Sequence, residues 1–157
     1  MFDDPQILTI PAQTTAVIRL RVPRSEIQAV MGPGIGELMA AVSAQGIGPA
    51  GAWFTHHFRM DPGFFDFEIG VPVRAAVTPV GRVQPGSLPA GQVARTIYRG
   101  GYEGLGAAWG SFESWLRAHG HTPAAELWET YAVGPESSAN PADWQTEFTR
   151  PLAVSTT

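Results

Sequence analysis

The sequence predicts an α+β fold made of two related halves, each folding as a strand, a helix and two further strands. Three observations support this prediction: short anchors recur in the same order in both halves, each half has one long helical pattern, and an aromatic or β-branched pair of strands follows each helix. Two βαββ units of this kind are expected to pair by pseudo-two-fold symmetry into an antiparallel sheet. That sheet would carry two long helices and leave a central ligand groove where the halves meet.

The repeat rests on three pairs of segments. In chain order, "IPAQTTAVIRLR" matches "LPAGQVARTIYR", "AQGIGPA" matches "AHGHTPA", and "DFEIGVPV" matches "QTEFTRPL". The order is the same in both halves and each pair falls in the same predicted element. We therefore predict a single domain over residues 1–157, with repeat halves at about 5–76 and 82–154.

In the first half, residues 14–22 alternate between Arg and apolar side chains, which is typical of a strand with one wet face. A helix is predicted over residues 25–46, with Ser25 as its cap, an interruption at 32–34 and a stop at Gly46. The aromatic-rich runs 51–60 and 64–73 are separated by a turn sequence, Asp-Pro-Gly, and predict a hairpin.

In the second half, residues 91–99 predict a strand and 102–120 a helix that stops at Gly120. Apolar side chains recur along this helix at spacings of three and four, which defines its buried face: Leu105, Trp109, Phe112 and Leu116. The last two strands are predicted over 125–133 and 144–154, joined by a polar loop. Residues 74–91, rich in Pro, are expected to be a partly extended connector between the halves and not a flexible Gly/Ser tether.

Composition excludes several classes of chemistry. The chain has no Cys, which removes disulfides and thiolate sites, and all ten basic residues are Arg, which removes lysine Schiff-base chemistry. The net charge is −4 without a basic cluster, so direct binding to nucleic acid is not expected. His56 and His57 point to opposite faces of a strand, so neither a metal site nor a cofactor is predicted.

No stretch of the sequence approaches the ~20 consecutive apolar residues of a membrane-spanning helix, so no membrane association is expected. The first residues carry two acids where a secretory signal has basic residues. A cytoplasmic location is therefore expected.

Glu129 stands out in the segment "LWETY". In a strand, Leu127, Glu129 and Tyr131 share one face, which leaves a carboxylate among apolar neighbours. Burial of that carboxylate is expected to raise its pKa, and a ligand that brings positive charge would relieve the cost. Two simpler interpretations remain: Glu129 faces solvent, or it pairs with a buried Arg.

Several motifs, among them "LPAGQVARTIYRGGYEGLGAAW", "WLRAHG", "LWETY" and "TEFTRPL", resemble the GyrI-like small-molecule-binding domain family. This domain occurs as the effector domain of AraC-type and MerR-type multidrug regulators, and alone as gyrase-inhibitory proteins. The resemblance implies a duplicated βαββ fold and a central pocket for amphipathic, aromatic or cationic compounds. It also implies that Glu129 is the buried glutamate of the W-E-x-Y motif and that the chain is a stand-alone version of the domain.

The predicted ligand-binding residues come from both halves. Tyr98, Tyr131 and Trp109 are the best candidates because the second-half strands and helix converge there in the fold that the resemblance implies. Trp53 or Phe54 would supply the opposite wall, depending on the strand register. The complete predicted set is Glu129, Tyr131, Tyr98, Trp109, Trp53, Phe54, His57, Tyr102 and Trp128.

Two functions of different classes follow. The first is a module that binds drug-like or toxin-like aromatic or cationic molecules for sensing, sequestration or resistance. The alternative is a hydrolase that detoxifies cyclopropanoid DNA-alkylating natural products, as a subset of stand-alone family members does, with Glu129 as the catalytic residue that orients or deprotonates water. Inhibition of gyrase or another protein by surface contact is a third possibility, for which the sequence shows no partner surface.

Overall fold

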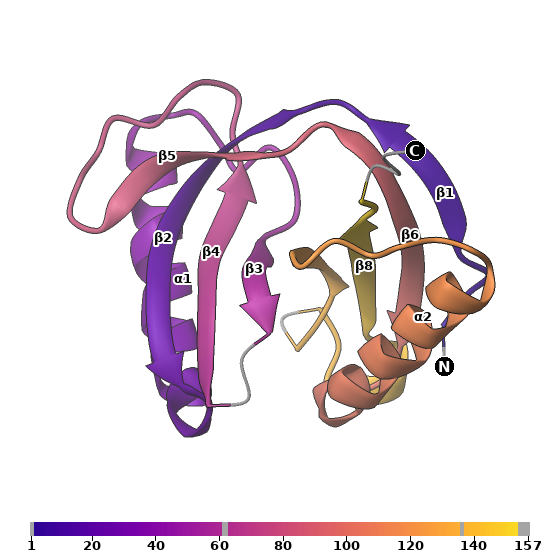
Figure 1. The fold of residues 1–157 in the computed structure, drawn as a ribbon. Coiled ribbons are helices and arrows are strands. Elements are labelled where there is room, and N and C mark those ends of the chain that lie inside the picture. The colour runs from indigo at the N-terminus through magenta and orange to yellow at the C-terminus, as the bar shows by residue number, and fades with distance from the viewer. Residues whose placement is uncertain (1, 61–62, 136, 154–157) are drawn as a thin grey trace. The chain divides into compact units, whose positions relative to one another are not determined.

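The computed structural model describes residues 2–60, 63–135 and 137–153, and these fall into two compact units. Unit 2 is the continuous segment Pro11–Ala90, whereas unit 1 combines the N-terminal segment up to Ile10 with the chain from Gly91 onward. Each unit consists of antiparallel strands covered by one helix (Figure 1). The predicted α+β class, with antiparallel sheet and two helices, is therefore confirmed.

In unit 2 the strands lie in the order β3-β4-β2-β5. Their bounds are β2 Gln13–Pro23, β3 Phe54–Met60, β4 Phe64–Pro72 and β5 Val83–Leu88. Helix α1, Ile27–Ala44, follows a short 3-10 turn, Arg24–Glu26, and packs on one face of this sheet. The core between them includes the fully buried side chains of Ile18, Leu38, Phe67 and Ile69.

In unit 1 the strands lie in the order β1-β6-β8-β7. Their bounds are β1 Gln6–Ile10, β6 Gly91–Arg99, β7 Leu127–Val133 and β8 Gln145–Pro151. Helix α2, Leu105–Ala118, follows the 3-10 turn Tyr102–Gly104, and a third 3-10 turn, Pro141–Asp143, precedes β8. The predicted apolar face of α2 packs onto this sheet: Trp109, Phe112 and Leu116 are buried against Leu127 and Phe148.

Most of the predicted elements are present, including the first-half hairpin of β3 and β4. Two residues of its predicted turn, Asp61 and Pro62, lie outside the described residues. Both predicted helix stops are confirmed, because Gly46 and Gly120 have φ of 67° and 80°, which glycine adopts without strain.

The segment 74–91 is not only a connector. It contains β5, which pairs with β2 in a register from Gln13 opposite Leu88 to Ile18 opposite Val83. The Pro-rich sequence predicts no strand here, but Pro85 is tolerated because β5 is an edge strand. The prediction also missed β1, which pairs with β6. Each repeat half thus gives its first strand to the unit that contains the rest of the other half.

Helix α1 also differs from the prediction. It runs unbroken from Ile27 to Ala44 with Pro33 inside it, and its first residue is preceded by Glu26, whose side chain makes no capping hydrogen bond. Ser25 lies in the preceding 3-10 turn, so the predicted cap is wrong. The helix continues through its Gly-Pro-Gly sequence because tertiary packing outweighs the low helix propensity of these residues. Neither described helix is long and apolar enough to cross a bilayer.

Candidate functional site

The carboxyl group of Glu129 lies on the face of β7 that α2 covers, in unit 1. It shares this face with Leu127 and Tyr131, and Phe148 of β8 stands directly opposite it in the ladder. The residue is 8% exposed. Strand alternation alone fixes this orientation, since three side chains at every second position must point the same way.

Aromatic rings from four elements, α2, β6, β7 and β8, line this face of the sheet. The indole of Trp109, from α2, stacks on Phe148 with ring centroids 4.1 Å apart and an interplanar angle of 9°. Tyr98, from β6, also stacks on Phe148, at 5.7 Å and 9°. The hydroxyl of Tyr131 donates a long hydrogen bond of 3.4 Å to Glu129 Oε2. Apolar ring surface thus surrounds the carboxyl group, and the Tyr131 phenol is hydrogen-bonded to it.

A second aromatic pair lies at the edge of this cluster. Tyr102, from the turn before α2, contacts the ring of Tyr131 edge-on at 5.8 Å and that of Trp144 at 4.8 Å. Both Tyr102 and Trp144 are half-buried. Gly100 N–H donates to Trp144 O at 3.1 Å, which ties the two segments together. Within the segment before α2, the Tyr98 hydroxyl donates to Gly101 O at 2.8 Å. These rings therefore form the solvent-facing rim of the cluster.

Burial raises the pKa of Glu129 from 4.5 to about 7, and interactions with Trp109 and Tyr131 only partly oppose it. The Trp109 indole N–H is near enough to the carboxyl group to lower this pKa, but the two groups do not form a regular hydrogen bond. The indole nitrogen has no hydrogen-bond partner among the described residues. No ion pair in the described part of the chain involves Glu129. Both simpler interpretations, solvent exposure and pairing with an Arg, are thus contradicted.

The other predicted site residues separate by unit and by face. Unit 1 brings together Glu129, Tyr131, Tyr98, Trp109 and Tyr102. Trp128 is only 2% exposed, but it alternates with Glu129 on β7 and so points to the other face of the sheet.

In unit 2, His57 and Thr55 lie on the same face of β3, and Phe67 of β4 stands opposite His57. Trp53 packs against the helix-covered core on this face. Phe54 is 1% exposed and points the other way, opposite Gly70. The register that the sequence left open therefore puts Trp53, not Phe54, on the face of His57.

Two aromatic residues of the cluster were missed in the sequence. Phe148 belongs to a predicted strand, and its alternation was readable, but only the register of β8 against β7 places it opposite Glu129. Trp144 follows the polar loop 134–143, where nothing in the local pattern distinguishes it. Its indole N–H donates to Ser138 O at 2.9 Å, which holds the ring against Tyr102.

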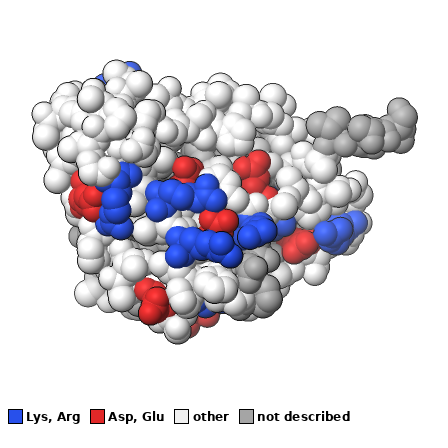
Figure 2. Space-filling view, turned by 60° about the vertical axis from the view of Figure 1, so that its left-hand side comes forward, with Lys and Arg blue, Asp and Glu red and all other residues white. Residues whose placement is uncertain are grey.

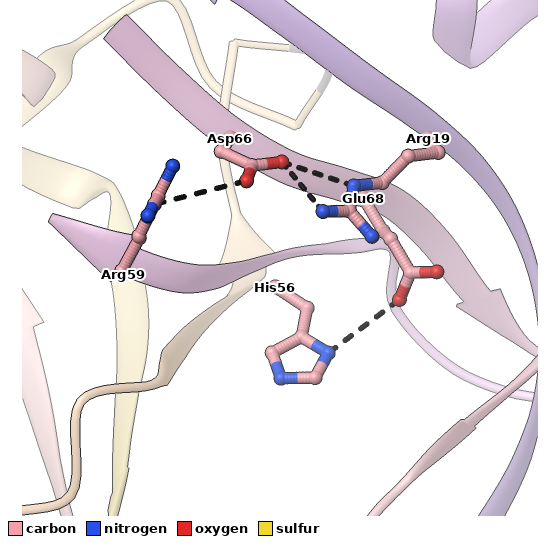
Figure 3. Close-up of polar contacts among 5 residues, drawn as sticks. All are labelled: Arg19, His56, Arg59, Asp66 and Glu68. Carbon is pink, nitrogen blue, oxygen red and sulfur yellow. Dashed lines mark hydrogen bonds and ion pairs between the residues drawn. The ribbon is translucent and has the colours of Figure 1, made fainter. Parts of the chain in front are cut away.

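The face of the unit 2 sheet opposite α1 carries a charged network (Figure 3). Asp66 accepts a hydrogen bond of 2.7 Å from Arg19 and lies 4.0 Å from Arg59, and His56 Nδ1 is 3.6 Å from Glu68 Oε1. In Figure 2 the Arg side chains form a band interrupted by acidic ones, so the face in this view has no uniform sign. Across the described residues, no three His, Asp or Glu side chains converge on a position that could hold a metal ion.

The family model of the GyrI-like small molecule binding domain matches residues 3–153, and the chain belongs to this family. No curated protein matches this chain. Among solved structures, the EcmrR C-terminal domain superposes with a TM-score of 0.83 at 22% identity, over 97% of this chain and 98% of that one. The present chain also superposes on EcmrR in its complex with DNA, with a TM-score of 0.82 at 21% identity. This match covers 96% of the present chain but only 57% of the EcmrR chain.

Two more distant structures share the fold. SAV2435 bound to tetraphenylphosphonium has a TM-score of 0.65 at 11% identity, over 96% of this chain and 94% of that chain. A hydrolase from Listeria innocua has a TM-score of 0.67 at 12% identity, over 95% and 91% of the two chains. At these identities the likeness shows a common fold.

Proposed function

We propose that the chain binds amphipathic aromatic cations through unit 1, with the carboxylate of Glu129 as the counter-charge, for sensing, sequestration or resistance. The observation that carries this proposal is a carboxyl group buried among rings without a basic partner in the described structure. Raising the pKa from 4.5 to about 7 means that the ionised form is disfavoured by about 3 kcal/mol. A bound cation would restore much of this free energy.

The rings around Glu129 suit the same class of ligand. Trp109 and Tyr131 present π-systems within the immediate surroundings of the carboxyl group, and a cation over such a face gains about 0.5 to 2 kcal/mol. Tyr102 and Trp144 at the rim, and Tyr98 beside Phe148, add flat apolar surface for the aromatic part of the ligand. The tetraphenylphosphonium bound to SAV2435 has both of these properties and serves as a probe.

The test is a titration with tetraphenylphosphonium, followed by calorimetry at pH 8 and pH 5.5. We expect the affinity of the wild-type protein to fall about tenfold or more at the lower pH, because protons compete with the ligand for the carboxylate. Glu129→Gln should weaken binding at pH 8 and remove the dependence on pH. Glu113→Gln, which removes a carboxylate of α2 paired with Arg117, should bind like the wild type. Affinity that is independent of both pH and Glu129 would refute the proposal.

A second function, hydrolysis of a strained cyclopropanoid electrophile, is favoured by one further observation. A carboxyl group with a pKa of about 7 is matched to general base catalysis at neutral pH, and the Tyr131 hydroxyl lies 3.4 Å from it. Glu129 would take a proton from a water molecule while the oxygen of that water attacks a cyclopropane carbon. The C–C bond would break, and its electron pair would pass to the conjugated carbonyl, which then takes up a proton.

Incubating a cyclopropanoid compound with a substoichiometric amount of the protein distinguishes binding from hydrolysis. Multiple turnovers to a product heavier by one water indicate hydrolysis, and Glu129→Gln should then abolish turnover. Protection of an amount of compound equal to the amount of protein, with no water added, indicates binding alone.

A further inference from the structure

Unit 2 repeats the arrangement around Glu129 with different residues. Aligning Glu68 with Glu147, as the sequence repeat does, places Ile69 of β4 at the position of Phe148 of β8. Thr55 stands opposite Ile69 as Glu129 stands opposite Phe148, and His57 then takes the place of Tyr131. The repeat thus gives both units one pair of polar side chains on the helix-covered face of an equivalent strand.

The two pairs share a local contact. His57 Nε2 and Thr55 Oγ1 are hydrogen-bonded at 3.2 Å, as the Tyr131 hydroxyl and the Glu129 carboxyl group are at 3.4 Å. They differ in charge: unit 1 has an acid at this position, whereas unit 2 has an imidazole and a hydroxyl. The chemistry of the two positions has therefore diverged while the backbone geometry has been kept.

Aromatic rings enclose His57 in the same way as they enclose Glu129. The imidazole stacks on Phe67 with centroids 5.1 Å apart at 15°, and it meets the ring of Phe65 edge-on at 5.7 Å. Arg24 places its guanidinium 4.4 Å from the centroid of Phe65. His57 is 6% exposed, whereas Arg24 and Phe65 are half-buried. His57 and Phe67 are thus the buried part of this cluster, and Arg24 and Phe65 are its more exposed part.

The electrostatic surroundings of His57 are the reverse of those of Glu129. Burial lowers the pKa of His57 to about 4, and the positive charges of His56 and Arg24 lower it further in the same direction. No acidic group contributes to this pKa. The ring is neutral at pH 7, and its buried Nδ1 has no hydrogen-bond partner in the part of the chain that the structure describes. A buried polar atom in this state costs free energy that a bound group would recover.

We infer that unit 2 holds a second binding site, in which His57 Nδ1 and the Arg24 guanidinium bind an aromatic carboxylate. The carboxylate would accept a hydrogen bond from the imidazole N–H and a charge-assisted one from Arg24, and the aromatic ring of the ligand would lie against the partly exposed Phe65. The inference goes beyond the proposed function, because it gives the two halves of the repeat ligands of opposite charge. A water molecule on Nδ1 is the alternative occupant and is one outcome of the test.

The first test uses the wild-type protein and 1-naphthoate, with the imidazole resonances of the four His residues followed by NMR. We expect the His57 signals to shift with saturation, and the pKa of His57 to rise from about 4, because the carboxylate stabilises the imidazolium. The signals of His119 and His121 should not move. His57 signals that stay unchanged at high naphthoate concentration would overturn the inference and leave water as the occupant.

A second measurement compares variants. His57→Phe keeps the ring contacts with Phe67 and removes the nitrogen atoms, and we expect it to weaken 1-naphthoate binding about tenfold. Arg24→Gln should weaken it similarly, whereas the control His121→Gln should leave it unchanged. Naphthoate affinity that is the same in His57→Phe as in the wild type would count against the inference.

The two probes, tetraphenylphosphonium and 1-naphthoate, distinguish the two sites. Glu129→Gln should weaken tetraphenylphosphonium binding but not naphthoate binding, and His57→Phe should do the opposite. If naphthoate depends on His57 while the cation fails to bind, the proposed function fails and the second site stands. If the cation depends on Glu129 and naphthoate does not bind, the reverse holds.

Discussion

At the scale of single residues, Glu129 is a group whose charge opposes folding. Its carboxyl group is buried beside Trp109 and Tyr131, and neither of these can offer it a positive charge. Such a group is tolerated in a marginally stable protein when its ionisation is used. His57 in unit 2 is buried in a neutral form for the same physical reason, although its pKa moves in the opposite direction.

The charge of Glu129 predicts how stability depends on pH. Its pKa is higher in the folded state than in the unfolded state, so between about pH 4.5 and 7 the folded protein binds more protons and stability falls as pH rises. We expect Glu129→Gln to gain up to about 3 kcal/mol relative to the wild type between pH 4 and pH 8. Urea unfolding of both proteins across this range measures the difference. Parallel pH profiles would show that the carboxyl group is solvated in the folded state.

At the scale of single elements, α1 shows how packing selects glycine inside a helix. A Cβ on Gly34 would come too close to Cδ1 of the fully buried Ile69. A Cβ on Gly36, about half a turn further along the helix, would meet open space. The glycine at position 34 therefore lets the helix approach β4 closely, whereas the one at 36 has no such contact.

This difference gives a matched pair of variants. Gly36→Ala should stabilise the protein by about 0.5 to 1 kcal/mol, because alanine has the higher helix propensity. Gly34→Ala should lose that gain and destabilise by about 1 kcal/mol or more, because the tightly packed core around Ile69 must shift. Thermal unfolding of the two variants measures the effect. Equal stabilisation by both would mean that α1 packs less closely on β4 than described.

At the scale of the whole molecule, the chain passes between its two units twice. Only Pro11 and Ala12 separate β1 in unit 1 from β2 in unit 2, and only Pro89 and Ala90 separate β5 from β6. Each unit therefore takes an edge strand from the other half of the repeat. The sheet of unit 1 is complete only when Gln6–Ile10 pairs with β6, which begins at Gly91.

Removing residues 1–10 should consequently destabilise unit 1. It deletes the partner of β6 and takes the partly buried side chains of Phe2 and Ile7 from the core around Phe112. We expect faster hydrogen exchange for the backbone amides of β6, with little change for those of α1. Gln6→Ala, which alters an exposed side chain of β1 and keeps the pairing, serves as the control. Unchanged exchange in β6 would show that β1 contributes no stability.

Local pattern was enough to predict much of this protein. Period-two alternation put Glu129 and Tyr131 on one face of a strand, and spacings of three and four identified the face of α2 that carries Trp109. The glycines at 46 and 120 marked the helix ends, because only a positive φ satisfies the turn there. The duplication itself was legible, since equivalent elements kept equivalent residues.

What only the tertiary structure decided depends on contacts between residues far apart in the chain. β5 pairs with β2 despite Pro85 and Gly86, and α1 runs unbroken through Pro33 and packs closely on Ile69 at Gly34. The register of β8 against β7 brings Phe148 opposite Glu129. Sequence determined which side chains share a face, because that follows from backbone geometry within one element. Structure determined what those faces meet, because the free energy of packing is a property of elements brought together by the fold.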